Sequence, residues 1–496
     1  MSTAPTRSVP TRLAIGLARR GVRALVYGLV GGLVVLLVVA GRHLDARPDL
    51  RVWHVARLDA EFSVESPVAS FAEYLDREQR LFEQLERRVE AKLRAEDRTR
   101  LNRYHRGSLS DPGRWPRDWN RSFEFAANAP RAGVLLLHGM SDSPYSLRSL
   151  GQALHARGAW VVGLRIPGHG TVPSGLVRVA WEDMAAAVQL ALRHLDERVD
   201  GAPLYVVGYS NGAALAVNHA IAALEDPSLT SLDGLVLLSP AIGVTPLAAF
   251  AVWQARLGHL LGLPKLAWNS ILPEYDPFKY NSFAVNAGDQ VYRLTTAIGA
   301  GLDRLQAAGR IEELPPVLAF QSLSDATVST RAVIDGLFLR LRGAGHELVL
   351  FDVNRLAAAE DLLGTDPKAA IAAELDGAPL PFALGLVTNE SEMSPRVVLR
   401  RKRAGGTAVA EEALGLEWPR GVYSLSHVAL PFPPTDPLYG GPDAPESPGV
   451  QLGRVELRGE RGVLVVSASD VMRLRWNPFY AFLEERVLGA LGLAEP

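Results

Sequence analysis

The chain has 496 residues, of which 48% are hydrophobic, and its formal net charge at pH 7 is -2. This length allows one large domain or two ordinary ones, and the near-neutral charge gives no sign of a polyelectrolyte partner such as nucleic acid. The absence of cysteine excludes disulfides, a thiolate nucleophile and cysteine-ligated zinc or iron–sulfur sites.

An uncharged apolar segment lies near the start of the chain. Residues 24–41 read ALVYGLVGGLVVLLVVAG and would span roughly 27 Å as a helix, close to the ~30 Å of a bilayer core. A cleaved signal peptide is the alternative, but Arg42 and His43 follow where a cleavage site needs small residues. We therefore predict a single-pass membrane anchor. Arginines flank it on both sides, and we expect the basic tail 1–23 to stay inside and the large domain to be extracytoplasmic.

Residues 42–121 are predicted to form a helical and linker region. Between Ser66 and Leu93, apolar side chains recur at helical spacing among Glu and Arg, which indicates a long amphipathic helix. Such a helix either packs on the following domain or lies on a membrane surface, and we expect packing. Residues 103–120 are polar and contain Gly and Pro, which is typical of a linker or a lead-in strand.

From about residue 122, short apolar runs alternate with helical segments. The runs lie at 134–137, 160–164, 204–207, 235–238, 317–320 and 348–353, with helices expected near 145–156, 181–195, 331–341 and 479–491. This alternation predicts an α/β domain over 122–496, with a mostly parallel sheet covered by helices on both faces. Two stretches break the pattern. We expect an aromatic cap insertion at about 241–314 and a second insertion at about 356–420.

A serine sits between a strand and a helix in the third of these units. The run 204–207 leads into Gly208-Tyr209-Ser210-Asn211-Gly212, and an Ala-rich helical segment follows. A G-x-S-x-G pentapeptide in this context forms a tight turn that lifts the serine hydroxyl off the end of the sheet. We predict that Ser210 is a nucleophile, the alternative being a structural turn serine.

A serine nucleophile needs two N–H donors for the developing oxyanion. The sequence Leu137-His138-Gly139-Met140 follows the first clear strand, so we expect the backbone amides of Met140 and Asn211 to supply them. We expect His138 itself to be structural, because its backbone position is what the turn uses. His169, after the next strand, is expected to shape its loop.

The serine also needs a base and a carboxylate that orients the base. Asp325 follows the strand 317–321 and is the predicted carboxylate, since Ser329 is the better N-cap for the next helix. The base must come later in the chain, which leaves His346 and His427. His346 precedes a strand and would emerge at the wrong end of the sheet, so His427 is the predicted base.

The order of these motifs resembles the α/β-hydrolase superfamily, and within it serine hydrolases of the monoacylglycerol lipase and lysophospholipase type. The motifs are HG at 138–139, PGHG at 167–170 and GYSNG at 208–212, followed by Asp325 and His427. The resemblance covers the chain from about Phe123 onward. It implies an α/β-hydrolase fold with a cap, a Ser210–His427–Asp325 triad, and oxyanion amides at Met140 and Asn211. The long insertion between Asp325 and His427 and the N-terminal anchor depart from the simplest members.

These observations predict a membrane-anchored serine hydrolase that cleaves carboxylic esters, of an acyl or lipid-like kind, through an acyl-enzyme. It would need no metal and no organic cofactor. The expected partners are a small ester substrate and the membrane, with no nucleic acid. A serine peptidase or acyltransferase on the same fold is one alternative, and a non-catalytic binding protein that keeps the fold is another. The sequence does not define the oligomeric state.

Overall fold

The computed structural model describes residues 45–243, 263–356, 366–455, 467 and 472–494, with scattered residues between 22 and 42. The chain divides into two units, Met1–Asp49 and Leu50–Pro496, and the fold below is that of the second. Within the described residues, no helix is long and apolar enough to cross a membrane. The basic tail, most of the predicted anchor 24–41, and residues 244–262 of the predicted cap lie outside the described part of the chain.

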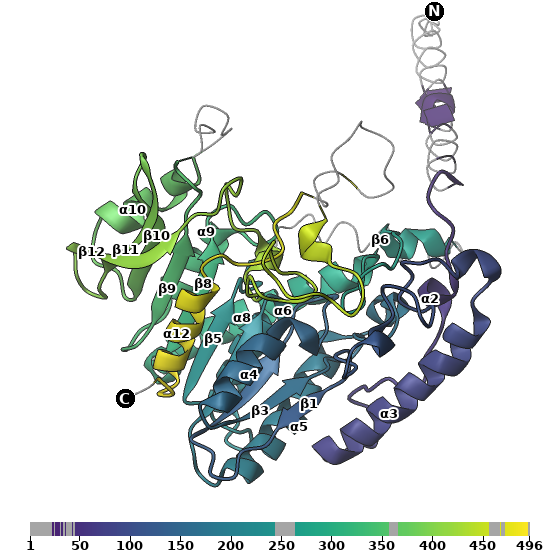
Figure 1. Ribbon diagram of the computed structural model, residues 1–496, viewed down its shortest axis with the longest axis horizontal. Helices are drawn as coiled ribbons and strands as arrows, with labels where there is room; N and C mark the ends of the chain where they lie inside the picture. The colour runs from purple at the N-terminus through teal and green to yellow at the C-terminus, as the bar shows by residue number, and fades with distance from the viewer. Residues whose placement is uncertain are drawn as a thin grey trace, which may run out of the picture. The chain divides into compact units, whose positions relative to one another are not determined.

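A ten-stranded sheet forms the centre of the second unit among the residues described (Figure 1). Its strands are β1 (Phe123–Phe125), β2 (Ala132–Leu137), β3 (Ala159–Leu164), β4 (Leu204–Tyr209), β5 (Gly234–Leu238), β8 (Val317–Ser322), β9 (Glu347–Phe351), β10 (Ala383–Ser391), β11 (Ser394–Lys402) and β12 (Val409–Glu417). Their spatial order is β1-β3-β2-β4-β5-β8-β9-β10-β11-β12, and β3 through β10 are parallel. The antiparallel strands β1, β11 and β12 lie at the two edges. The predicted mostly parallel sheet is confirmed.

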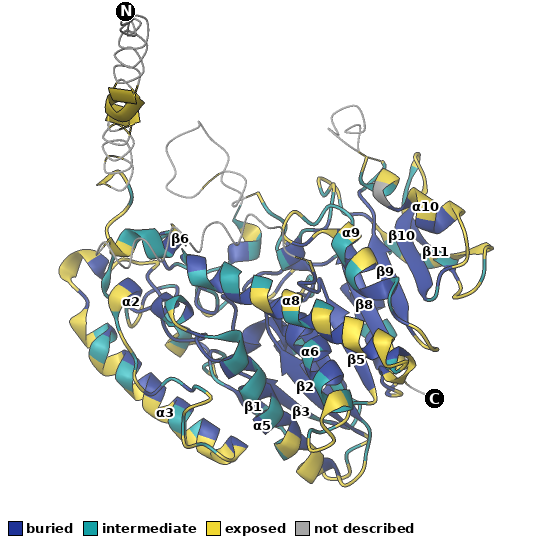
Figure 2. Cartoon of the chain, turned by 180° about the vertical axis from the view of Figure 1, so that it is seen from behind, coloured by how far each residue is buried: buried dark blue, intermediate teal, exposed yellow. Residues whose placement is uncertain are grey.

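Helices cover both faces of this sheet. The α-helices of the second unit, among the residues described, are α2 (Val52–Val55), α3 (Phe71–Arg88), α4 (Arg148–Ala156), α5 (Trp181–Val199), α6 (Asn211–Glu225), α8 (Val285–Ala307), α9 (Thr330–Val333), α10 (Ala372–Asp376) and α12 (Tyr480–Ala490). Helices α4 and α12 pack on one face (Figure 1), and α5, α6 and α8 on the other (Figure 2). Strand β2 shows why both faces need a cover. Val134 and Leu136 belong to the core under α4 and α12, whereas Leu135 and Leu137 belong to the core under α5 and α6.

The two predicted insertions contribute to the sheet and its cover. Helix α8, in the region predicted to be a cap, packs on α6 and buries one apolar face there. Before α8, β6 (Trp268–Ser270) and β7 (Phe283–Ala284) form a separate two-stranded sheet. The aromatic side chains Trp268, Phe278 and Tyr280 of this region are buried in the protein. In the second region, 356–420, β10 pairs with β9 in parallel and extends the main sheet through β11 and β12.

The amphipathic helix predicted within 66–93 is α3, and it packs on the rest of the unit. Its residue Glu78 is buried and accepts hydrogen bonds from the Ser122 amide and hydroxyl at 3.0 and 2.8 Å. The Glu78 carboxylate also accepts from Arg165 Nε at 3.0 Å, at the end of β3. Burial raises the pKa of Glu78, while the charge of Arg165 and the Ser122 bonds act against that rise. Arg165 in turn donates to the carbonyl of His169 at 3.1 Å, so α3 supports the loop that follows β3.

Replacing Glu78 with Ala should lower the free energy of unfolding by about 2 kcal/mol, because Arg165 Nε loses its buried acceptor while Glu61 still pairs with the guanidinium. Urea denaturation followed by fluorescence measures this difference. The matched control is Arg80→Ala on the exposed face of the same helix, which should change the free energy by less than about 0.5 kcal/mol. Equal effects of the two substitutions would show that the Glu78–Arg165 pair does not hold α3 in place.

Candidate active site

Ser210 occupies a sharp turn between β4 and α6. Its backbone has φ 54° and ψ -114°, a left-handed conformation that costs a non-glycine residue about 1–3 kcal/mol. The surrounding structure fixes this backbone. The Ser210 amide donates to Leu238 O at 2.9 Å, and the Ser210 carbonyl accepts from the amides of Ala213 and Ala241, both at 3.1 Å. The strand, turn and helix predicted around Ser210 are all present.

The two glycines of the pentapeptide leave no room for a side chain. A Cβ on Gly208 would lie 2.5 Å from backbone atoms of Ala213, at the start of α6. A Cβ on Gly212 would lie 2.1 Å from the carbonyl oxygen of Leu137, in the neighbouring strand β2. The glycines therefore let α6 start directly against the ends of β4 and β2, which is what brings Ser210 and the turn after β2 together.

The Ser210 hydroxyl faces the imidazole of His427. His427 Nε2 lies 3.1 Å from Ser210 Oγ, and His427 Nδ1 lies 2.7 Å from Asp325 Oδ2. Both the histidine and the serine are buried. An ionised carboxylate only accepts hydrogen bonds, so this network assigns the proton to Nδ1 and leaves the lone pair of Nε2 toward Ser210. The structure thus brings the three predicted side chains into one hydrogen-bonded row.

Asp325 is held as an anion by several donors. Its Oδ1 accepts from the amides of Thr327 and Val328 at 2.7 and 2.9 Å, and its Oδ2 also accepts from Gln321 Nε2 at 3.0 Å. Burial is the largest influence and raises the pKa of Asp325, but the hydrogen bond and charge of His427 and the two amides outweigh it. The pKa of Asp325 therefore lies below its usual value, and the carboxylate is ionised at neutral pH. The neighbouring helix α9 is capped by Ser329, whose Oγ accepts from the Ala332 amide, as the sequence predicted.

The two predicted oxyanion donors lie at the ends of adjacent strands. Leu137 of β2 pairs with Gly208 of β4, so the turn after β2 and the turn at Ser210 meet at the same edge of the sheet. The Asn211 amide is the first of helix α6, and the first N–H groups of a helix have no partner within it. Met140 sits in the turn Gly139–Asp142, which is closed by the Asp142 amide and the Gly139 carbonyl at 3.2 Å. An amide pair here can stabilise a negative oxygen next to Ser210.

Comparisons with known proteins bear on the class of enzyme. A family model described as "Hydrolase_4: Serine aminopeptidase, S33" matches residues 128–349. The thermostable monoacylglycerol lipase of Bacillus sp. (strain H-257) is 28% identical over 235 residues, which is 46% of this chain and 86% of that protein. The chain is a serine hydrolase with an α/β-hydrolase fold. It resembles monoacylglycerol lipase-like esterases.

Solved structures similar to this hydrolase include two lipases. The monoacylglycerol lipase of Paleococcus ferrophilus is 20% identical, with a TM-score of 0.35, and the match covers 46% of this chain and 87% of that one. A soluble variant of monoglyceride lipase from Saccharomyces cerevisiae is 16% identical, with a TM-score of 0.37, over 46% of this chain and 81% of that one.

The other histidines considered as candidates are held in structural positions. His138 Nδ1 bonds to Gly139 O at 2.9 Å, and its Nε2 accepts from the Ile166 amide at 3.1 Å. Burial and the neighbouring His169 lower the pKa of His138 well below its usual value, so the ring is neutral. His346 accepts from the Val317 amide at 3.3 Å and bonds to Arg342 O, where β8 and β9 begin. His346 therefore lies at the opposite end of the strands from Ser210.

Three residues that sequence reasoning did not single out place the histidine and the aspartate. The ring of Tyr209 packs against the ring of His427, with centroids 5.4 Å apart. Ser322 Oγ donates to Leu425 O at 2.6 Å and fixes the loop before His427. Gln321, with Nε2 on Asp325, and Ser322 both lie at the end of β8. Gln321 and Ser322 are two buried polar side chains at the end of an apolar strand, on the edge of the sheet where Ser210 lies, and this is the signal that could have revealed them.

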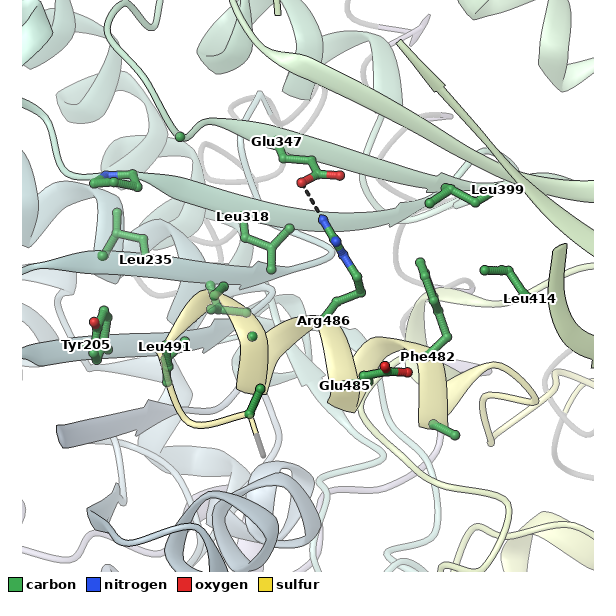
Figure 3. Close-up of a pocket in the computed structure, with 18 of the residues that line it drawn as sticks. Tyr205, Leu235, Leu318, Glu347, Leu399, Leu414, Phe482, Glu485, Arg486 and Leu491 are labelled. Atoms are coloured by element: carbon green, nitrogen blue, oxygen red, sulfur yellow. Dashed lines mark hydrogen bonds and ion pairs between the residues drawn. The ribbon is translucent and has the colours of Figure 1, made fainter. Parts of the chain in front are cut away.

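A cavity of about 910 Å³ lies away from this site, between α12 and the strands that it covers (Figure 3). Its walls include Tyr205, Leu235 and Leu318, which stand near the amino ends of β4, β5 and β8. Arg486 reaches from α12 to Glu347 of β9 at its centre, at 2.5 Å. Ser210 follows the carboxyl end of β4, five residues after Tyr205, or roughly 16 Å along the strand. The cavity is therefore separate from the Ser210 site.

Adding a methyl group at Gly212 should disable the site. In Gly212→Ala, the new Cβ would clash with the Leu137 carbonyl, so α6 must shift and carry Ser210 and Asn211 with it. A displacement of about 1 Å at reacting groups costs roughly 10²-fold in rate. We expect fluorophosphonate labelling to slow by at least that factor and the melting temperature to fall.

The control for this substitution is Gly288→Ala in α8, where a Cβ meets no atom within 4 Å. It should label at the wild-type rate and gain about 0.5–1 kcal/mol in stability, since alanine favours helix more than glycine does. If Gly212→Ala reacted with the fluorophosphonate at the wild-type rate, the close packing of α6 against β2 would not be needed to position Ser210.

Proposed function

We propose that this chain is a membrane-anchored serine esterase in which Ser210, His427 and Asp325 cleave acyl or lipid-like carboxylic esters. The observation that carries the proposal is the hydrogen-bonded row from Ser210 Oγ through His427 to Asp325 Oδ2, with distances of 3.1 and 2.7 Å. A serine hydroxyl attacks a carbonyl only when a base takes its proton, and His427 Nε2 is the base within reach.

The reaction follows from this arrangement. Ser210 Oγ bonds to the ester carbonyl carbon while its proton moves to His427 Nε2, and the Met140 and Asn211 amides receive the oxyanion. Ionised Asp325 stabilises the imidazolium and holds the ring in place. The tetrahedral intermediate then expels the alcohol, which takes the proton from His427 and leaves an acyl-serine. Water attacks the acyl-serine with the same proton transfers, releasing the carboxylic acid and restoring Ser210.

Two findings bear on the bond that is cleaved. The curated relative is named a monoacylglycerol lipase and matches over 86% of its own length, which favours an acyl glyceride or a similar ester as the substrate class. The matching family model carries the description of an aminopeptidase, so an amide substrate is the second candidate. An acyltransferase would use the same acyl-serine and differ only in the acceptor. A non-catalytic binding protein would have no use for the complete row of three side chains.

Replacing Ser210 with Ala should abolish fluorophosphonate labelling and lower kcat/KM for p-nitrophenyl esters by at least roughly 10⁴-fold. The matched control is Ser239→Ala, because Ser239 is also a buried serine with left-handed backbone (φ 45°) at the end of the adjacent strand β5. This variant should label like the wild type. A Ser210→Ala protein that still labels would contradict the assignment.

A substrate panel with the wild-type protein separates ester from amide hydrolysis. We expect p-nitrophenyl esters of graded chain length to be hydrolysed and aminoacyl-naphthylamides to be left intact. The reverse preference would support the peptidase alternative. A folded protein inert toward both the panel and the probe would support the binding protein.

The proposed anchor is residues 24–41, and its support is the uncharged composition of this segment and the arginines before it. Changing both Val35 and Leu36 to Arg puts two charges at its middle, each costing about 2.5–3.5 kcal/mol of insertion free energy. The full-length chain should stay with membranes through an alkaline carbonate wash, and the double variant should be released. Protease added outside sealed cells should cleave the catalytic unit if it is extracytoplasmic. Release of the wild type by carbonate would overturn the anchor.

A further inference from the structure

A largely buried strap of the chain bonds to the loops that follow β2 and β3. The strap, residues 273–282, lies in the part of the chain between β6 and β7. The segment before β1 holds the strap in place. The Arg103 amide donates to Glu274 O at 2.9 Å, and Asn120 Nδ2 donates to Pro277 O at 3.0 Å. From the C-terminal side, Tyr439 donates its hydroxyl to Asp276 Oδ2 at 2.6 Å. The strap is therefore fixed by segments far apart in the sequence.

Two consecutive strap residues contact the turn that contains Met140. The Tyr280 amide donates to Ser141 O at 2.8 Å, and Lys279 Nζ donates to Asp142 Oδ1 at 2.8 Å. Tyr280 also uses its hydroxyl, which accepts from the Thr171 amide at 2.7 Å in the loop after β3. Lys279 and Tyr280 thus join the strap to the two loops that follow β2 and β3.

The turn itself has a backbone that needs support. Its closing bond runs from the Asp142 amide to Gly139 O, so the Met140 amide is not used within the turn. Ser141 has φ 66°, the left-handed value that the third residue of a type II turn requires and that glycine adopts more easily than serine. The strap bonds to Ser141 and Asp142 fix the half of the turn where this unfavourable conformation lies.

Asp142 also brings a negative charge close to the oxyanion position. Its side chain is 7% exposed, and Lys279, which is 25% exposed, is its ion-pair partner. The carboxylate packs under the turn, since a Cβ on Gly139 would lie 2.9 Å from Asp142 Oδ2. An unpaired anion two residues from Met140 would oppose the negative charge that develops on the substrate oxygen. The ammonium of Lys279 offsets this charge and holds the carboxylate in place.

We propose that Lys279 is a positioning residue for the oxyanion turn: through its ion pair with Asp142 it orients the Met140 amide and neutralises the only charge of that turn. This inference rests on the proposed function of Ser210. Lys279 touches Asp142, and its effect on the reaction passes through the turn. It follows that Lys279 acts on kcat more than on substrate binding, because the oxyanion forms only in the transition state.

The test uses the full-length protein and p-nitrophenyl butyrate, with fluorophosphonate titration to count competent active sites. Lys279→Met should lower kcat per titrated site about 10- to 100-fold and change KM by less than about 3-fold. Complete loss of an oxyanion donor lowers kcat by about 10²–10³-fold, and a misplaced donor should cost less. Lys279→Arg should restore kcat to within about 5-fold of the wild type. The double variant Lys279→Met/Asp142→Asn should have a kcat at least about 5-fold higher than that of Lys279→Met, because the neutral amide that replaces the carboxylate does not oppose the negative charge of the oxyanion.

Arg304→Met is the matched control, because it removes a cation from the exposed pair with Glu225 at the far end of α8. It should leave kcat and KM unchanged. An unchanged kcat in Lys279→Met, or a double variant no better than the single one, overturns the positioning role. Loss of titratable sites alone, with normal kcat per site, shows a merely structural role and also overturns it. A wild type that neither titrates nor hydrolyses ester overturns the proposed function and this inference together.

Discussion

The close contact between α6 and the ends of β4 and β2 is the constraint on which the position of Ser210 depends. No side chain fits at Gly208 or Gly212, because each Cβ would meet backbone atoms at 2.5 and 2.1 Å. The same contact holds Ser210 in a left-handed conformation that it would not choose alone. Asn211 starts the helix, and the turn after β2 ends beside it. This one contact therefore fixes the positions of Ser210 and of the turn after β2 relative to each other.

The buried carboxylates near the carboxyl ends of the strands are stabilised by ion pairs or by hydrogen bonds from backbone amides. The Asp325 carboxylate accepts hydrogen bonds from two backbone amides, from Gln321 and from His427. It is therefore ionised at neutral pH although it is buried. Asp142 forms an ion pair with Lys279, and Glu78 accepts hydrogen bonds from Arg165 and Ser122. Each of these carboxylates stands next to a loop that follows a strand at the carboxyl edge of the sheet. Charges at such positions fix loop geometry as much as they contribute stability.

The sequence predicted the parts of the fold with strong local signals. Periodicity located the parallel strands and the amphipathic helix α3, and motif order brought Ser210, Asp325 and His427 together as candidates. Residues 382–387 and 397–401 looked strand-like, but 356–420 was interpreted as an insertion and not as an extension of the main sheet, because it lacks the strand–helix alternation that marked the domain.

Contacts between residues far apart in the sequence could not be predicted, because no local sequence pattern marks them. The aromatic residues Trp268, Phe278 and Tyr280 suggested a cap from composition, yet their burial depends on partners elsewhere in the chain. Tyr209 beside His427 and Lys279 beside Asp142 are pairs of the same kind.

The distance along the chain between the proposed nucleophile, Ser210, and the proposed base, His427, has a consequence for biosynthesis. Ser210 and His427 are 217 residues apart, and β8 through β12 are made between them. Contacts of such long sequence separation form late, because the loops that they close carry the largest entropy cost. A nascent chain that has emerged only through β12 contains the Ser210 turn but not yet His427. On the proposed mechanism, the enzyme therefore remains inert during most of its synthesis, and it can hydrolyse a substrate only when the segment after β12 has docked.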